Sequence, residues 1–153
     1  MRDRLTSLRF KNKLYRSLAI FIFTGYGLFM CYLLFFGFSR AARTERMMNL
    51  VPFKTISNYI TGFHHYNLDT WVINLFGNVA AFVPFGFLVP LVFPGVRSYL
   101  QIITRFFLAL LAVESIQWLF HVGSFDVDDI LLNIIGGLIG FAMLQRVRRL
   151  NKR

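Results

Sequence analysis

The sequence predicts an all-α membrane protein, a bundle of four transmembrane helices with the N and C termini in the cytoplasm. One observation is composition: 56% of the 153 residues are hydrophobic, including 19 phenylalanines, against roughly 45–50% in soluble domains. The other is that the apolar residues gather in four runs with basic residues at their ends. A chain of this length predicts one domain, residues 1–153.

The first two spans are uncharged. Residues 17–38 and 70–93 contain no Asp, Glu, Lys or Arg, and each is long enough for the ~20 residues that cross a hydrocarbon core. The second contains Pro84, which cannot donate a helix hydrogen bond to Ala80, so we expect a kink there. Gly77 and Gly86 are candidate packing or hinge residues of the same span.

The last two spans are shorter and carry charge. The third is predicted at residues 102–121 and contains Glu114, and the fourth at residues 126–145, with Asp126, Asp128 and Asp129 at its mouth. A basic tail, residues 146–153, follows. In the fourth span Gly136 and Gly140 form a small-xxx-small pair that favours close helix contact.

The Lys and Arg residues set the predicted direction. Thirteen of them lie in the N-terminal segment, the segment 94–105 and the C-terminal tail, four lie in the segment 39–69, and none lies between the third and fourth spans. The positive-inside rule places both termini in the cytoplasm. Because the basic residues flank apolar runs, the net charge of +10 indicates contact with anionic lipid headgroups and not nucleic acid binding.

The outer segment, residues 39–69, also contains an apolar pattern. Val51, Phe53, Ile56, Tyr59 and Ile60 approximate helical spacing after Pro52. We therefore expect a short amphipathic helix between the first and second spans, on the outer surface or at the mouth of the bundle.

Polar residues inside the spans are the candidate ligand-binding residues, because such residues are costly in hydrocarbon and usually face a bundle interior or a wet cavity. On each helix they repeat at three or four residues, which places them on one face. At ~1.5 Å per residue, Asn78 lies ~13 Å, and Glu114 and Asn133 ~10 Å, below the outer ends of their helices. The candidates are Asn74, Asn78, Glu114, Gln117, Asp126, Asp128, Asp129 and Asn133.

Structural roles are alternatives for each candidate. Asn74, Asn78 and Gln117 could join helices through hydrogen bonds, and the aspartates could cap the fourth helix, where acids suit the positive end of the dipole. The aspartates need a counterpart, either the outer basic residues Arg40, Arg43, Arg46 and Lys54 or a bound divalent cation. No protein metal site or other cofactor is expected from the pattern.

Four blocks of sequence resemble the VanZ-like family. They begin at Asn49 (NLVPFKTI), Asn74 (NLFGNVAAFVPFGFL), Glu114 (ESIQ) and Phe125 (FDVDDILLNIIGGLIG), in the family's order. The resemblance implies a bacterial, multi-pass protein of the cytoplasmic membrane whose family namesake is associated with resistance to the glycopeptide teicoplanin. It implies no established reaction. Its motif residues coincide with Asn78, Glu114, Gln117, Asp126, Asp129 and Asn133.

The leading functional hypothesis is a cell-envelope protein that binds a polar headgroup, of a membrane lipid or a lipid-linked envelope precursor, in an outer-leaflet polar cavity. Arg43 or Arg46 would meet a phosphate. One alternative is a membrane-embedded enzyme with Glu114 and Asp129 as its acid–base pair, although the chain has no HExxH or GxSxG motif. The other is a small proton-coupled carrier with Glu114 as the protonation site, which would require a homo-oligomer.

Overall fold

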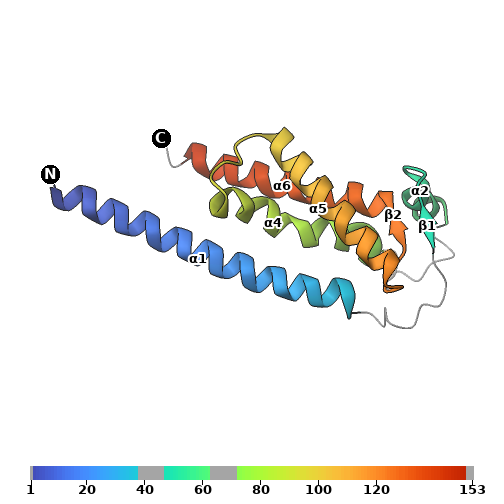
Figure 1. The fold of residues 1–153 in the computed structure, drawn as a ribbon. Helices are drawn as coiled ribbons and strands as arrows, with labels where there is room; N and C mark the ends of the chain where they lie inside the picture. Colours follow the sequence, from blue (N-terminus) through green and yellow to red (C-terminus); the bar gives the residue numbers. More distant parts are fainter. Residues whose placement is uncertain (1, 38–46, 63–71, 151–153) are drawn as a thin grey trace.

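The computed structural model describes residues 2–37, 47–62 and 72–150, and the side chains of the first helix from residue 13 onward. The order of elements is α1 (Arg2–Phe35), β1 (Met48–Asn49), α2 (Lys54–Thr61), η3 (Ile73–Gly77), α4 (Asn78–Val92), α5 (Tyr99–Leu119), β2 (Phe125–Asp126) and α6 (Val127–Leu150). Figure 1 shows the long helices α1, α4, α5 and α6 side by side, with α2 and both short strands at the end of the bundle opposite the two chain termini. We call these the distal and proximal ends.

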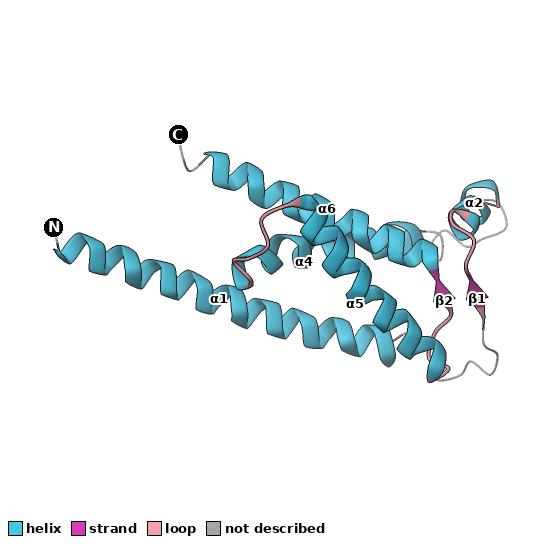
Figure 2. Ribbon diagram, turned by 45° about the horizontal axis from the view of Figure 1, so that its top comes forward, coloured by secondary structure: helices cyan, strands magenta, loops and turns pink. Residues whose placement is uncertain are grey.

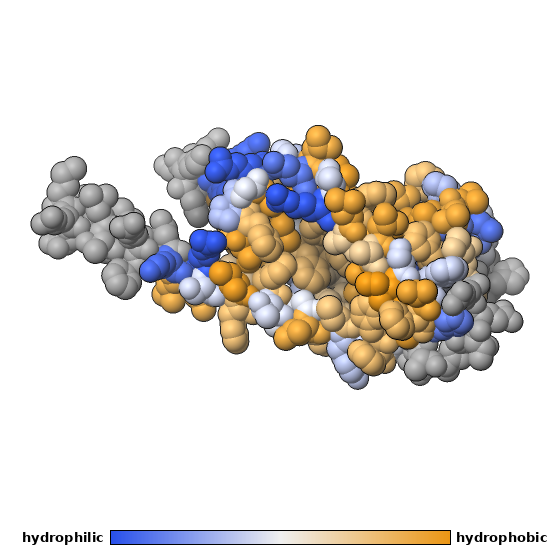
Figure 3. Space-filling model, in the orientation of Figure 1, coloured by the Kyte–Doolittle hydropathy of each residue, from blue (hydrophilic) through white to orange (hydrophobic). Residues whose placement is uncertain are grey.

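The four predicted spans are confirmed as four helices long and apolar enough to cross a membrane, Lys13–Phe35, Ile73–Val92, Tyr99–Leu119 and Val127–Leu150. The predicted short helix of the outer segment is also present, as α2. Figure 3 shows apolar residues over the middle of the visible face and hydrophilic residues gathered toward the proximal end. This distribution is the one expected of a helical bundle whose middle contacts the hydrocarbon core of a membrane.

The helical boundaries differ from the prediction at the basic ends. Arg146, Arg148 and Arg149, predicted in a tail, belong to α6, and Arg148 and Arg149 lie in its last turn. Arginine is a good helix former, and cations are favourable beside the negative end of a helix dipole. The helix therefore continues beyond Gln145 through the arginines. α1 likewise extends through the basic N-terminal segment to Arg2.

The second span begins as a π-helix. Residues Ile73–Gly77 form η3, which continues directly into α4. Pro84 and Pro90 lie inside α4, and the Tyr26 hydroxyl of α1 donates a 2.8 Å hydrogen bond to the Ala81 carbonyl. That carbonyl lies beside the one at Ala80 that Pro84 cannot serve, so α1 contributes a donor where the proline weakens the helix ladder.

α5 begins with a capping box. The Ser98 hydroxyl accepts a hydrogen bond from the Gln101 backbone N–H at 3.3 Å, and the Gln101 side-chain oxygen accepts one from the Ser98 N–H at 3.2 Å. These reciprocal bonds satisfy two of the donors that a helix start leaves open. The start at Tyr99 is three residues before the predicted residue 102 because the cap, and not the apolar run, sets it.

Glycine determines how closely α4 and α6 pack. A Cβ at Gly136 would lie 2.1 Å from the Val79 carbonyl oxygen, and a Cβ at Gly140 would lie 1.9 Å from that of Val83. A Cβ at Gly86 would lie 1.9 Å from the Gly137 carbonyl oxygen. The two backbones are therefore in direct contact, a geometry that small residues permit in membrane helix pairs. Gly77 differs, since a Cβ there would meet only the Ile73 side chain, at 3.7 Å.

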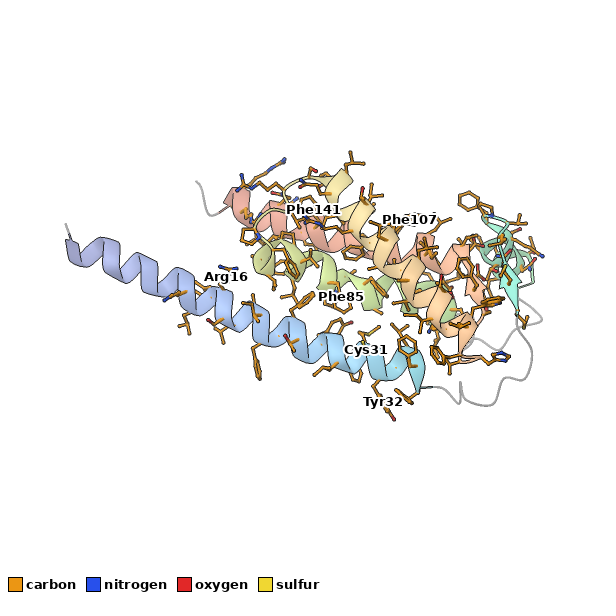
Figure 4. The ribbon with its side chains drawn as sticks, viewed as in Figure 1. Arg16, Cys31, Tyr32, Phe85, Phe107 and Phe141 are labelled. Atoms are coloured by element: carbon orange, nitrogen blue, oxygen red, sulfur yellow. The ribbon has the colours of Figure 1, made fainter. Side chains whose placement is uncertain are left out.

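The four spans differ in how much of each is buried. α6 is the most buried and α1 the least. The core includes Phe82, Phe106, Ile134 and Phe141. α1 lies against α4 through aromatic contacts, with Tyr26 and Phe85 ring centroids 5.0 Å apart. Figure 4 shows Phe85 between α4 and α1, whereas Tyr32 points away from the bundle.

A two-stranded parallel sheet joins β1 to β2, and the sequence pattern did not predict it. Met48 pairs with Phe125 and Asn49 with Asp126, and the Phe125 N–H donates to the Met47 carbonyl at 3.1 Å. Figure 2 shows the two strands lying side by side at the distal end. This pairing fixes the segment before α2 to the segment that starts α6.

Candidate functional site

The motif residues gather at the distal end. Here β2, the start of α6 and the end of α5 meet residues 47–62, the stretch with β1 and α2 that we call the α2 segment. Five buried polar or charged side chains belong to this region: Glu114, Gln117, Asp126, Asp128 and Asn133. Together with the half-buried Asn78 and Asp129, we call them the distal cluster. The α2 segment supplies many of their hydrogen-bond partners, although it is separated from α6 by more than seventy residues of chain.

Asp128 binds the N-terminus of α2. Its carboxylate, 0% exposed, accepts three backbone N–H bonds, from Phe53 at 2.6 Å, Thr55 at 2.7 Å and Ile56 at 3.1 Å. Phe53 has the left-handed conformation, φ 65°, and its own side chain does not cap α2. Asp128 therefore acts as the cap of a helix in another part of the chain, where the dipole also favours a negative charge.

Asp126 connects three elements. One carboxylate oxygen accepts from the Asn49 side-chain amide at 3.0 Å and from the Asp128 N–H at 2.9 Å. The other accepts the Thr55 hydroxyl at 2.6 Å. Asp126 thus caps the first turn of α6 and also holds β1 and α2 against it.

Glu114 and Gln117 project from α5, one turn apart. The Glu114 carboxylate accepts the backbone N–H of Asp126 at 3.1 Å, and the Gln117 amide donates to the Leu34 carbonyl at 2.7 Å. Leu34 lies in the last turn of α1, where helix carbonyls lack partners within the helix. Gln117 therefore joins α5 to the distal end of α1.

Asn78 and Asp129 form a polar contact between α4 and α6. The Asn78 amide donates to an Asp129 carboxylate oxygen at 2.7 Å, and both side chains are half-buried. Asn74, one turn earlier on η3, is also half-buried. The structure thus pairs Asn78 with Asp129 and Glu114 with Asp126, so these pairs lie at the first turn of α6 and not at the level of Asn133.

Asn133 lies one turn further along α6, on the side that faces α4. It is 4% exposed, and its side-chain oxygen has no hydrogen-bond partner among the described residues. A buried carbonyl oxygen without a donor costs roughly 1–3 kcal/mol, so it is a place where a donor from a ligand would be stabilised.

The counterparts expected for the aspartates were the outer basic residues or a bound cation. Among the described residues, Asp126 and Asp128 accept hydrogen bonds from backbone and side-chain donors of the α2 segment. Arg40, Arg43 and Arg46 lie outside the described residues. Within the described ranges, no group of three or more His, Cys, Asp and Glu side chains is placed to hold a metal ion.

Sequence reasoning missed the contribution of Asn49 and Thr55. Both lie in the first motif block, and the Asn49 amide also donates to the Thr55 hydroxyl at 3.0 Å. The sequence signal that could have identified them is that Asn49 and Thr55, two hydrogen-bonding residues, lie on either side of Pro52 near the predicted amphipathic helix. Their partners could not be assigned without the β1–β2 pairing.

These features define a class: a multi-pass helical membrane protein whose distal end is an acid-rich polar cluster closed by a short surface helix. Comparison with known proteins identifies the family. The family model described as VanZ/LLP1 matches residues 23–148, and the chain belongs to this family.

A similar curated protein is Protein VanZ of Enterococcus faecium. It is 27% identical over 99 residues, which cover 65% of this chain and 53% of that protein. The chain therefore spans about half the length of this relative. No solved structure matches the chain.

Proposed function

We propose that the protein binds the polar headgroup of a membrane lipid or lipid-linked envelope precursor at the distal cluster, in the outer leaflet of a bacterial cytoplasmic membrane. The observation that carries this proposal is the buried Asn133 oxygen, for which the described part of the chain provides no hydrogen-bond donor. It lies one helical turn from Asp129, so two acceptors face the same side of α6. The ligand would donate hydroxyl or ammonium hydrogens to them.

The surrounding contacts support binding over catalysis. Asp126 and Asp128 are held by Asn49, Thr55 and the α2 backbone, which leaves them to shape the site. Glu114 orients the Asp126 backbone. Because Protein VanZ is similar to this chain, we further propose a contribution to resistance against teicoplanin-type glycopeptides.

Native mass spectrometry of the purified protein tests the binding proposal. The unmodified protein should carry a discrete lipid adduct that Glu114→Gln, Asp129→Asn and Asn133→Leu lose. Asn58→Leu, at an exposed position of α2, is the control and should retain the adduct. An adduct whose mass changes with time would indicate an enzyme.

Asn133→Leu separates binding from structural glue. Replacing an unsatisfied buried oxygen with an apolar group is expected to be neutral or stabilising, so this variant should lose the adduct while its melting temperature stays equal or rises. A variant that melts earlier and keeps the adduct would show that Asn133 only supports the fold. Expression of both forms in a glycopeptide-sensitive bacterium then tests resistance.

A further inference from the structure

A groove of about 570 Å³ lies between α1, α4 and α5 and extends from the edge of the distal cluster toward the proximal end. Its walls are mainly aromatic and aliphatic, and include Phe23, Leu34, Phe85 and Phe93. Ligand pockets commonly have volumes of ~300–1,000 Å³. In a protein that meets lipid on all sides, such a groove is accessible to hydrocarbon chains.

The groove has two different ends. At its distal end lies Leu34, whose carbonyl accepts the Gln117 amide, so α1 and α5 are joined there. At its proximal end lie Phe93, Gly95 and Arg105. Phe23 of α1 packs edge-on against Phe93 with ring centroids 5.8 Å apart.

Arg105 is the charged residue among the described residues that line the groove. It is six positions beyond Tyr99, the first residue of α5, which places it ~9 Å into the span. An arginine at that depth is costly unless it reaches an interface or meets an anion. A guanidinium binds phosphate with two parallel hydrogen bonds.

We propose that the groove binds one acyl chain of an anionic glycerophospholipid, whose phosphate pairs with Arg105 at the proximal end. Charge complementarity selects this occupant over a second copy of the chain. The proximal end of a second copy would bring its own basic residues, among them Arg97, Arg146 and Arg149, to Arg105. The proposal is independent of headgroup binding at the distal cluster.

Two glycines of α1 provide a matched pair of variants. Among the described residues, no atom lies within 4 Å of a Cβ added at Gly27 or at Gly25, so the first side-chain carbon fits at either site. Gly27 lines the groove and Gly25 does not. A leucine at position 27 would therefore occupy the groove, whereas one at position 25 would lie outside it.

The test is native mass spectrometry of the delipidated full chain, titrated with phosphatidylglycerol and with phosphatidylcholine of the same acyl chains. We expect Gly27→Leu to weaken phosphatidylglycerol binding at least tenfold and Gly25→Leu to leave it unchanged. Arg105→Gln should reduce phosphatidylglycerol binding to the level of phosphatidylcholine. Arg16→Gln, at an exposed position of α1 that does not line the groove, removes the same charge and should have no effect.

The proposal is overturned if Gly27→Leu and Gly25→Leu bind lipid equally, or if Arg16→Gln lowers the preference for phosphatidylglycerol as much as Arg105→Gln does. Cys31→Phe, a second substitution in the groove wall, gives the same comparison if Gly27→Leu does not fold. Asn133→Leu should bind phosphatidylglycerol normally, which distinguishes failure here from failure of the distal site.

Discussion

At the residue scale, Asp128 shows how a buried acid can join two distant segments. A carboxylate without exposure is strongly unfavourable unless donors surround it, and Asp128 has three backbone N–H groups from the α2 segment. The same bonds hold Phe53 in its left-handed conformation, which costs about 1–3 kcal/mol in a residue other than glycine. The acid and the strained turn therefore depend on each other.

Asp128→Asn should release the start of α2. An amide has one acceptor oxygen in place of two, so it cannot serve donors on both sides of the carboxylate, and each charged hydrogen bond lost costs about 1.5–3 kcal/mol. We expect faster hydrogen exchange at the amides of Phe53, Thr55 and Ile56. Ser57→Ala, on the exposed side of α2, is the control, and equal exchange in both variants would show that Asp128 does not hold the helix.

Tyr26→Phe should weaken the attachment of α1 to α4. The variant removes the donor to the Ala81 carbonyl and keeps the ring contact with Phe85. Polar contacts between membrane helices contribute about 0.6–1.7 kcal/mol, so thermal unfolding in detergent should show a loss of that size. Tyr32→Phe, at a side chain 60% exposed, should melt as the unmodified protein does, and an equal loss in both would rule out a specific role for the hydroxyl.

At the element scale, the contact between α4 and α6 depends on glycine, and Gly140→Ala should separate the two helices. The added Cβ would lie 1.9 Å from the Val83 carbonyl oxygen, and overpacking of this kind typically costs about 1–3 kcal/mol. In Gly25→Ala, no atom of the described residues lies within 4 Å of the new Cβ, so this variant should be neutral or stabilising. Unfolding midpoints measured side by side would contradict the prediction if both variants moved in the same direction.

The elements also differ in how far the sequence predicts them. Each span depends on local length and apolarity, so all four were predicted. The spacing of Val51, Phe53, Ile56, Tyr59 and Ile60 predicted a short helix, but only the last three belong to α2, because Phe53 is its left-handed N-cap. The strands were not predicted, because two residues have no periodicity and the pairing of Asn49 with Asp126 joins distant parts of the chain. The π-helix at Ile73–Gly77 likewise has no signal in an apolar run.

The candidate site was predictable as a group but not in its pairings. Helical spacing placed Glu114 with Gln117 and Asp129 with Asn133 on shared faces. A depth count from helix ends could not determine that Glu114 would meet the Asp126 backbone, because the turn after α5 brings the chain back beside that helix. The sequence also could not show which groups bind Asp128. Its donors are backbone N–H groups of the α2 segment, and a backbone donor leaves no pattern of residue types.

At the scale of the whole molecule, charge is divided between the two ends. Among the described residues, Glu114, Asp126, Asp128 and Asp129 lie toward the distal end together with one basic residue, Lys54 of α2, whereas Arg16, Arg97, Arg105 and the arginines of the last turn of α6 lie toward the proximal end. Both chain termini are at the proximal end (Figure 1). Short cytoplasmic loops carry an excess of Lys and Arg. This asymmetry therefore predicts that the proximal end faces the cytoplasm.

Fusions at the C-terminus test that orientation directly. We expect green fluorescent protein fused after Arg153 to fluoresce in the cytoplasmic membrane, and alkaline phosphatase at the same position to be inactive, because it matures only outside the cytoplasm. Phosphatase inserted after Gly123, in the turn between α5 and β2, should be active and serves as the matched control. The opposite pattern at both positions would place the acid-rich cluster in the cytoplasm. The distal site would then face a cytoplasmic ligand, and the anionic phospholipid at Arg105 would come from the outer leaflet.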